Sequence, residues 1–181
     1  MNRQKQKTND KHTLPRVFFT RPVLEVAPEL LGCFLVRRLS NGTLLRSRII
    51  EVEAYDGEHD LASHVSKGKT KRTHVMYEEG GVWYVYLVYG MHHMLNMVTG
   101  TQDDPSAVLI RGVDDVVGPG KLTKYFAVDT ACNGTIADPL YGNLWIEKGD
   151  SVVVPFVQTP RIGVLYAKEW AEAPYRFVLT K

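Results

Sequence analysis

The sequence predicts a single α+β domain, a mostly antiparallel sheet with a few short flanking helices. Short runs rich in β-branched and aromatic residues recur along the chain, and turn residues separate them. Helical patterns are short and few, at residues 20–32 and 118–126. A length of 181 residues and a hydrophobic content of 44% fit one domain that buries a core.

The first helix is expected to begin at Thr20, whose hydroxyl suits an N-cap, with Pro22 in its first turn. Gly32 is expected to close it, and Pro28 could divide it into two pieces. The apolar stripe that would face the core comprises Val23, Val26, Leu30 and Leu31.

Two strands are expected next, at residues 34–38 and 44–55, because the Asn41-Gly42 pair between them is a strong hairpin signal. Side chains alternate between the two faces of a strand. The period of two therefore places four residues of the second strand on one face: Ile49, Glu51, Glu53 and Tyr55.

The rest of the chain combines loops, short strands and one further helix. Residues 56–74 are polar and charged and are expected to form a loop. Gly118-Pro-Gly120 would open an amphipathic helix with Leu122, Tyr125 and Phe126 on one side. Pro160-Arg-Ile-Gly163 is expected to be a tight segment. The further expected strands are 82–88, 92–99, 106–111, 140–148, 151–157 and 175–180.

Charge and cysteine content exclude several classes of protein. The net charge is only +2, so contact with nucleic acid would have to come from a local patch. Cys33 and Cys132 are too few for a disulfide framework, and no apolar run approaches the roughly 20 residues of a membrane span. Residues 1–13 are expected to form a flexible polar tail before a domain of residues 14–181. These features are typical of a soluble intracellular protein.

Glu53 is the first candidate for chemistry. A buried carboxylate beside a tyrosine can activate water as a general base, or stabilise the cationic sugar that forms when a glycosidic bond breaks. The alternative is structural: Glu51 and Glu53 would pair with Arg46 and Arg48 on a solvated strand.

Tyrosines are concentrated in the segment 83–90. Tyr84 and Tyr86 share a face by parity, where they could stack on a flat ring. Tyr89 has the opposite parity and precedes Gly90, so it could project from a turn as a wedge for the gap left by an extruded base. The alternative for each tyrosine is a place in the sheet core.

Two segments could contact phosphate. Residues 66–74 hold four Lys or Arg residues, and Gly118-Pro-Gly-Lys121 could present N–H groups and a lysine at a helix start. A solvated loop and an ordinary turn are the alternatives. His59, His64 and the pair His92-His93 could bind a metal, but no metal-binding spacing occurs. P-loop, dinucleotide and Gly-x-Ser-x-Gly motifs are absent too.

Taken together, these segments resemble the alkyladenine (3-methyladenine) DNA glycosylase family. Each matching piece is short, but the pieces occur in the family's order across residues 14–180, which makes the set highly specific. They are Leu30-Leu-Gly32, Glu51-Val-Glu-Ala-Tyr55, Ala62-Ser-His64, Thr70-Lys-Arg72, Tyr84-Val-Tyr86, Tyr89-Gly-Met91, Asn96, Ala107-Val-Leu-Ile-Arg111, Gly118-Pro-Gly-Lys-Leu122, Pro160-Arg-Ile-Gly163 and Arg176-Phe177.

The resemblance implies catalytic and base-binding roles. Glu53 would deprotonate the attacking water, which Arg111 and the backbone carbonyl of Ile162 would help to hold. Asn96 would crowd the pocket floor and disfavour the amino group of a normal guanine. The residues that would sandwich the flipped base are Tyr55, His64 and Tyr86.

It also implies contacts with double-stranded DNA that contains damaged purines. Tyr89 would enter the minor groove and occupy the vacated space, with Met91 close by. The expected phosphate contacts are Thr70, Arg72 and Lys121. The family fold is a single domain around a curved antiparallel sheet, in agreement with the predicted strands. The protein would act as a monomer in the cytoplasm of a bacterial-type cell, associated with the nucleoid.

The implied reaction hydrolyses the N-glycosidic bond of 3-methyladenine or 7-methylguanine, with hypoxanthine as a less certain substrate. An alkylated purine carries positive charge, which weakens this bond and favours stacking on tyrosine. No lysine falls among the pocket positions, so the enzyme would leave an abasic site without nicking the strand. No cofactor and no metal are implied.

The chain departs from the family pattern at two places. Only six residues separate Arg111 from Gly118, where relatives usually carry a longer, partly helical insertion, and His92-His93 replace a position that is often aromatic. Three other interpretations remain open: a non-catalytic nucleic-acid-binding protein that retains the base pocket, a metal hydrolase that uses the histidines, and an RNA-processing enzyme.

Overall fold

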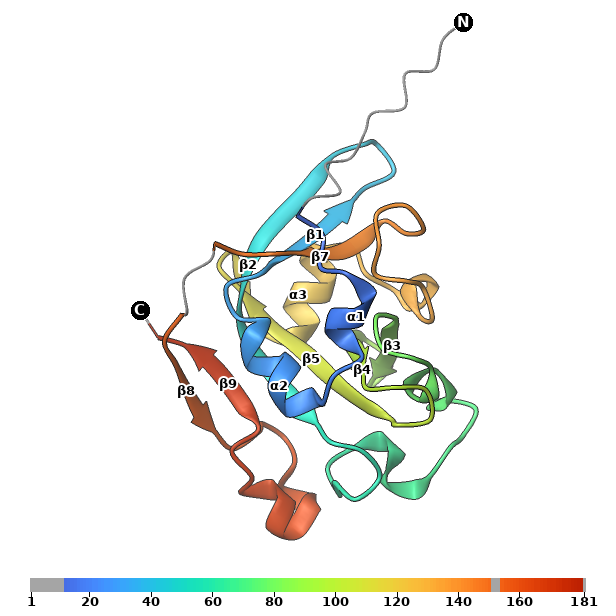
Figure 1. The fold of residues 1–181 in the computed structure, drawn as a ribbon, viewed down its shortest axis with the longest axis vertical. Coiled ribbons are helices and arrows are strands. Elements are labelled where there is room, and N and C mark those ends of the chain that lie inside the picture. Colours follow the sequence, from blue (N-terminus) through green and yellow to red (C-terminus); the bar gives the residue numbers. More distant parts are fainter. Residues whose placement is uncertain (1–11, 151–153, 181) are drawn as a thin grey trace, which may run out of the picture.

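A curled antiparallel sheet dominates the computed structural model, which describes residues 12–150 and 154–180 (Figure 1). The main path of the sheet is β3 (Trp83–Val88), β4 (His92–Thr99), β5 (Ser106–Val113), β2 (Leu44–Tyr55), β1 (Phe34–Arg38) and β7 (Leu144–Glu147). Three short strands lie off this path. The strand β6 (Val116–Val117) pairs with β5, and β9 (Arg176–Leu179) pairs with β2. The strand β8 (Phe156–Thr159) pairs in turn with β9. The predicted α+β class with a curved antiparallel sheet is confirmed.

Short helices pack on the sheet and connect its strands. Side chains of α1 (Arg16–Phe19), α2 (Val23–Glu29) and α3 (Pro119–Tyr125) enter one core with β2, β4 and β5. The 3-10 helices of the described residues are η1 (His64–Lys67), η2 (His74–Tyr77), η3 (Thr130–Cys132) and η4 (Leu165–Ala171).

Alternation along the strands separates the core from a second face. On β5, Val108 and Ile110 are buried in the core, whereas Leu109 and Arg111 line a cavity on the other side. Neighbouring strands follow the same alternation, since Trp83 and Val85 enter the core and Tyr84 and Tyr86 line the cavity. One face of the sheet therefore stabilises the fold, and the other carries polar and aromatic side chains.

A bulge in β2 overturns one prediction. The register between β2 and β5 shifts on both sides of Glu51, and Ile49 is buried in the core together with Val52. The predicted common face is therefore wrong for Ile49, because an extra residue in a strand reverses the alternation that follows it. Glu51 and Glu53 do act together, since both contact Arg111.

The first predicted helix begins later in the structure than the sequence indicated. Thr20 is not an N-cap: it ends α1, and its hydroxyl donates a hydrogen bond to the carbonyl of Val17 at 3.0 Å. The helix α2 begins after Pro22 and is not divided by Pro28, which lies in its last turn. The expected apolar stripe of this helix is buried.

The structure also differs from the predictions in several other segments. Leu140 and Tyr141 form an exposed turn held by Asp138 rather than the start of a strand. In α3, Leu122 and Phe126 are buried but Tyr125 is 42% exposed. Residues 1–11 of the expected tail and 151–153 of the expected strand 151–157 lie outside the described residues, and Thr13 pairs with Glu147.

Candidate active site

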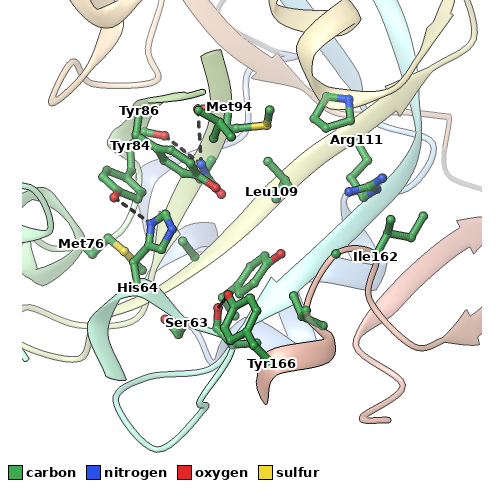
Figure 2. A pocket seen from close by; sticks show the side chains of 18 residues that line it. Ser63, His64, Met76, Tyr84, Tyr86, Met94, Leu109, Arg111, Ile162 and Tyr166 are labelled. Carbon is green, nitrogen blue, oxygen red and sulfur yellow. Dashed lines mark hydrogen bonds between the residues drawn. The ribbon is translucent and has the colours of Figure 1, made fainter. Parts of the chain in front are cut away.

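A cavity of about 230 Å³ opens on the polar face of the sheet (Figure 2). Pockets for drug-sized ligands span roughly 300–1,000 Å³, so this one suits a single small ring system. Its lining is largely aromatic and includes Tyr55, His64, Tyr84, Tyr86, Asn96, Arg111, Ile162 and Tyr166. The structure thus brings together residues that the sequence separates by more than one hundred positions.

Glu53 lies immediately behind the cavity wall and is fully buried. Its Oε1 accepts a hydrogen bond from the backbone N–H of Ile162 at 2.8 Å, and its Oε2 accepts one from the Tyr55 hydroxyl at 2.9 Å. The guanidinium of Arg111 lies 3.3 Å from Oε1. The carboxylate is therefore held in one orientation by Arg111 and Ile162, which were predicted to hold the water, and by Tyr55, which was predicted to stack on the base.

Opposing effects act on the pKa of Glu53. Burial raises this pKa, while the charge of Arg111 and the hydrogen bonds from Ile162 and Tyr55 partly offset the increase. A carboxylate whose pKa is raised holds a proton more strongly than a solvated one. This environment suits a general base.

Arg111 belongs to a network of two arginines and two glutamates. Its Nε donates to Oε1 of Glu51 at 2.9 Å, and the Nε of Arg176 donates to the same oxygen at 2.7 Å. The structural alternative for the glutamates is wrong, because Arg46 pairs with Glu147 and Arg48 pairs with Asp114. Neither Glu51 nor Arg176 was predicted to belong to the site, although both lie within the matched motifs.

Aromatic rings form two separate walls of the cavity. The ring centroids of His64 and Tyr86 are only 4.5 Å apart, so no flat ligand can enter between them, since a sandwiched ring needs about 7 Å. Tyr55 belongs to a different strand and is held through its hydroxyl by Glu53. Tyr55, His64 and Tyr86 all line the cavity, so a planar ligand can lie against these rings but cannot enter between His64 and Tyr86.

Tyr84 and Asn96 fix the cavity floor. Nδ1 of His64 lies 3.1 Å from the Tyr84 hydroxyl. The Asn96 side-chain amide donates to the carbonyls of Tyr84 and Met94, at 3.1 and 3.4 Å. Because both partners are acceptors, the amide nitrogen must face them, which fixes the orientation of Asn96.

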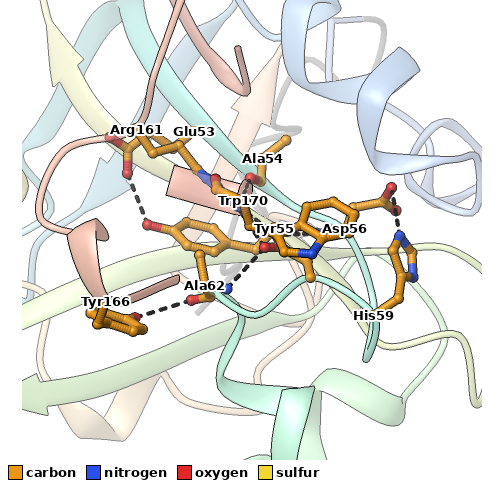
Figure 3. Close-up of polar contacts among 10 residues, drawn as sticks. Glu53, Ala54, Tyr55, Asp56, His59, Ala62, Arg161, Tyr166 and Trp170 are labelled. Carbon is orange, nitrogen blue, oxygen red and sulfur yellow. Dashed lines mark hydrogen bonds and ion pairs between the residues drawn. The ribbon is translucent and has the colours of Figure 1, made fainter. Parts of the chain in front are cut away.

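A buried ion pair that the sequence did not predict supports the wall beside Glu53 (Figure 3). The guanidinium of Arg161 pairs with both oxygens of Asp60, and the two side chains are fully buried. Arg161 also donates to the carbonyls of Ala54 and Trp170 and stacks on Tyr55, 4.8 Å from the ring centroid. Asp60 lies in the segment expected to be a solvated loop, and its local sequence carries no signal of this burial.

The residues predicted to contact DNA lie at exposed positions. Tyr89 is 89% exposed and has a φ of 51°, and Met91 is 72% exposed in the same turn between β3 and β4. Thr70 and Lys121 are also exposed, and the Thr70 hydroxyl lies 3.0 Å from that of Thr73. Arg72 is exposed too, and its guanidinium lies over the Tyr86 ring, 5.0 Å from its centroid.

The candidate metal ligands lie apart. Among the described residues, no group of three or more His, Cys, Asp or Glu side chains could hold a metal ion. His59 lies near Asp56, and His92 packs against Gly120. Within the same residues, no helix has the length and hydropathy needed to span a membrane.

Comparison with known proteins gives matches that cover most of the chain. The profile of the family described as methylpurine-DNA glycosylase (MPG) matches residues 17–117 and 115–181. Curated relatives named "Putative 3-methyladenine DNA glycosylase" include proteins of Legionella pneumophila (strain Lens), 44% identical over 92% of this chain and 93% of the relative, and Myxococcus xanthus, 45% identical over 90% and 88%. A Methanocella arvoryzae protein of the same name is 44% identical over 91% and 90%. The ordered motifs, the curved sheet and these matches agree, and the chain belongs to the methylpurine-DNA glycosylase family.

Proposed function

We propose that this protein is a monofunctional DNA repair glycosylase that extrudes alkylated purines from duplex DNA and hydrolyses their N-glycosidic bonds. The observation that carries the proposal is the buried Glu53 carboxylate, held by Tyr55, Ile162 and Arg111 directly behind an aromatic cavity of about 230 Å³. 3-Methyladenine and 7-methylguanine are the proposed substrates, and hypoxanthine is a further candidate.

In the proposed reaction, the extruded base stacks between Tyr55 and the His64–Tyr86 pair. Its positive charge favours binding to electron-rich aromatic faces. Water attacks C1′ of the sugar, the electron pair of the C1′–N bond passes to the base, and the proton of the water passes to Glu53. The carboxylate also stabilises the cationic sugar as the bond breaks. Arg111 would help to position the water, and an abasic site remains.

The exposed turn with Tyr89 and Met91 is proposed to enter the DNA and fill the space that the base leaves. An apolar side chain at such a tip can separate stacked bases. The net charge of +2 provides no general attraction to DNA, so phosphate contacts must come from individual side chains. The proposed ones are Thr70, Arg72 and Lys121.

The test uses a labelled duplex with one 3-methyladenine-like or hypoxanthine lesion, incubated with the protein in EDTA. Strand breaks that form only after hot alkali, and that disappear in Glu53→Gln, are the expected result. Glu25→Gln, on the exposed side of α2, is the matched control and should retain activity. Normal binding without base release from either lesion would overturn the proposal and indicate a binding protein that retains the pocket.

A further inference from the structure

Two carboxylates contact the guanidinium of Arg111 at different nitrogens. Its Nε donates a hydrogen bond to Oε1 of Glu51 at 2.9 Å, whereas its Nη1 lies 3.3 Å from Oε1 of Glu53. A guanidinium is planar, so contacts at two of its nitrogens fix the direction of its remaining N–H groups. Arg111 also lines the cavity (Figure 2). Glu51 therefore holds Arg111 where it reaches both Glu53 and the cavity.

A second arginine uses the same oxygen of Glu51. Arg176 lies opposite Glu53 in the pairing of β9 with β2, yet its Nε donates to Oε1 of Glu51 at 2.7 Å and its Nη1 donates to the Thr159 hydroxyl at 3.0 Å. The side chains are largely buried, since only 8% of Glu51, 12% of Arg111 and 22% of Arg176 is exposed. Little water screens these contacts, so each charge acts strongly on its neighbours.

The charges of this network balance only when Arg176 is included. Glu51 and Glu53 contribute two carboxylates, and Arg111 and Arg176 contribute two guanidinium groups. Without Arg176, one guanidinium would have to compensate two buried carboxylates, and its hydrogen bond to Glu51 is shorter than its contact with Glu53. With Arg176 present, Glu51 has a cation of its own, so the charge of Arg111 stays available to Glu53.

We propose that Glu51 and Arg176 are positioning residues for the reaction: Glu51 holds Arg111 beside the general base, and Arg176 keeps Glu51 from drawing Arg111 away from it. The inference rests on the proposed function, in which Glu53 activates water. Neither Glu51 nor Arg176 is among the described residues that line the cavity. Both therefore act on the reaction through Arg111 and Glu53 rather than through the base.

The two positioning residues should move the pKa of Glu53 in opposite directions. Burial raises this pKa, Arg111 lowers it, and the charge of Glu51 raises it. Loss of the Glu51 charge should therefore lower the pKa, whereas loss of Arg176 leaves Glu51 less compensated and should raise it. The other ionisable groups that act on or with Glu53 are Tyr55 on the same strand, Tyr86 on β3 and Arg161 before η4.

The measurement is the pH profile of single-turnover 7-methylguanine release for the wild type, Glu51→Gln, Arg176→Gln and the double variant. The acid limit of activity should fall by about one pH unit in Glu51→Gln and rise by about one pH unit in Arg176→Gln. The double variant loses one charge of each sign, so its limit should return toward that of the wild type. Glu147→Gln, which breaks the pair of Glu147 with Arg46 on β2, is the matched control and should leave the limit unchanged.

A purely structural role gives a different result. Loss of packing would lower the rate at every pH in both variants, and acid limits that stay fixed or move in the same direction would overturn the inference. Carbon-13 NMR of the Glu53 carboxyl group, assigned by its loss in Glu53→Gln, follows the same titration without activity. A wild type that releases no base would overturn the proposed function, while the NMR titration would still test how Glu51 and Arg176 act on Glu53.

Discussion

At the scale of single residues, the site depends on buried ionisable groups, whose pKa values respond strongly to neighbouring charges. Glu53 is fully buried, and Arg111 is the largest of the influences that offset the effect of burial on its pKa. In the proposed role of general base, Glu53 must be ionised to act, so its pKa would set the lower pH limit of activity. This limit is therefore expected above the value of 4.5 that an ordinary glutamate has.

Replacing Arg111 with glutamine should move this limit to higher pH. Loss of the positive charge leaves burial less opposed, so the pKa of Glu53 rises further and activity is lost at a higher pH on acidification. The pH profile of single-turnover 7-methylguanine release measures the change. Arg111→Lys retains the charge and should show a smaller shift, and identical acid limits in all three proteins would contradict the prediction.

His64 should make stability depend on pH in the opposite sense from a histidine whose pKa is raised by an anionic partner. Its pKa is lowered to about 4 from 6.5, so between these values the unfolded chain binds the proton and the folded protein does not. The stabilisation is complete above pH 6.5 and is lost as the pH falls toward 4.

Urea unfolding at pH 4 to 7 should therefore show that the wild type loses on the order of 2 kcal/mol more than His64→Gln over this range. The difference between the two proteins also removes the contribution of Glu53, which has the opposite sign because its pKa is raised. Parallel curves for the two proteins would contradict the lowered pKa.

Single residues differ in how well the sequence predicted them. The common face of Glu53 and Tyr55 followed from the period of two, and the hydrogen bond between their side chains agrees with it. Asp60 and Arg161 were not predicted to meet, because nothing in a local pattern indicates a partner 101 positions away.

At the scale of elements, the Asp60–Arg161 pair joins the loop after β2 to the segment before η4. The two carbonyl partners of Arg161 lie in the adjoining elements, Ala54 in β2 and Trp170 in η4. Removing one member of a buried pair leaves the other charge without compensation, and typical costs are 3–5 kcal/mol.

Asp60→Ala should lower the free energy of unfolding by about 3–5 kcal/mol. Asp114→Ala provides the matched control, because it breaks the exposed pair with Arg48 and should cost no more than about 1 kcal/mol. Urea denaturation monitored by circular dichroism compares the two variants. Equal effects would show that Asp60 is not needed to compensate Arg161.

The turn between β3 and β4 carries a separate prediction. Tyr89→Ala should reduce release of a lesion that is paired in the duplex more strongly than release of the same lesion opposite an abasic site, because an unpaired base is easier to extrude. Tyr141→Ala removes another exposed tyrosine, 73% exposed before β7, and should affect neither rate. An equal reduction for both substrates would argue against a wedge.

Elements were predicted best where local chemistry defines them. The Asn41-Gly42 signal correctly predicted the hairpin of β1 and β2, and Gly42 takes a positive φ of 87° at the end of the turn that begins at Leu39. The bulge around Glu51 and the turn at Asp138 were missed, because both depend on side chains and register that periodicity does not encode.

At the scale of the whole molecule, a small net charge means that binding to DNA must be local. Lys121 lies at the start of α3 and is exposed. If it contacts a phosphate, Lys121→Ala should weaken binding to all sequences equally and reduce the slope of log Kd against log salt by about 1. Arg21→Ala, which removes an arginine paired with Glu29, is the control and should leave the slope unchanged.

The family was recognisable from sequence because its motifs extend over the whole chain in a fixed order. The geometry of the site was not recognisable from sequence, because its hydrogen bonds connect distant strands. Arg176 and Glu51 are 125 positions apart, yet the Arg176 Nε donates a hydrogen bond to Glu51 at 2.7 Å. Such contacts arise only when β9 pairs with β2.

This separation has a consequence for biosynthesis. Ribosomes add about 5–20 residues per second, so roughly 6–25 s pass between the synthesis of Glu51 and that of Arg176, 125 positions later. During this interval Glu51 on β2 lacks its partner Arg176, and the edge of β2 that later pairs with β9 has no neighbouring strand. Messages that end early would yield chains that contain Glu53 and the aromatic wall but lack Arg161 and Ile162. Repair capacity should therefore follow the number of finished chains rather than the number started.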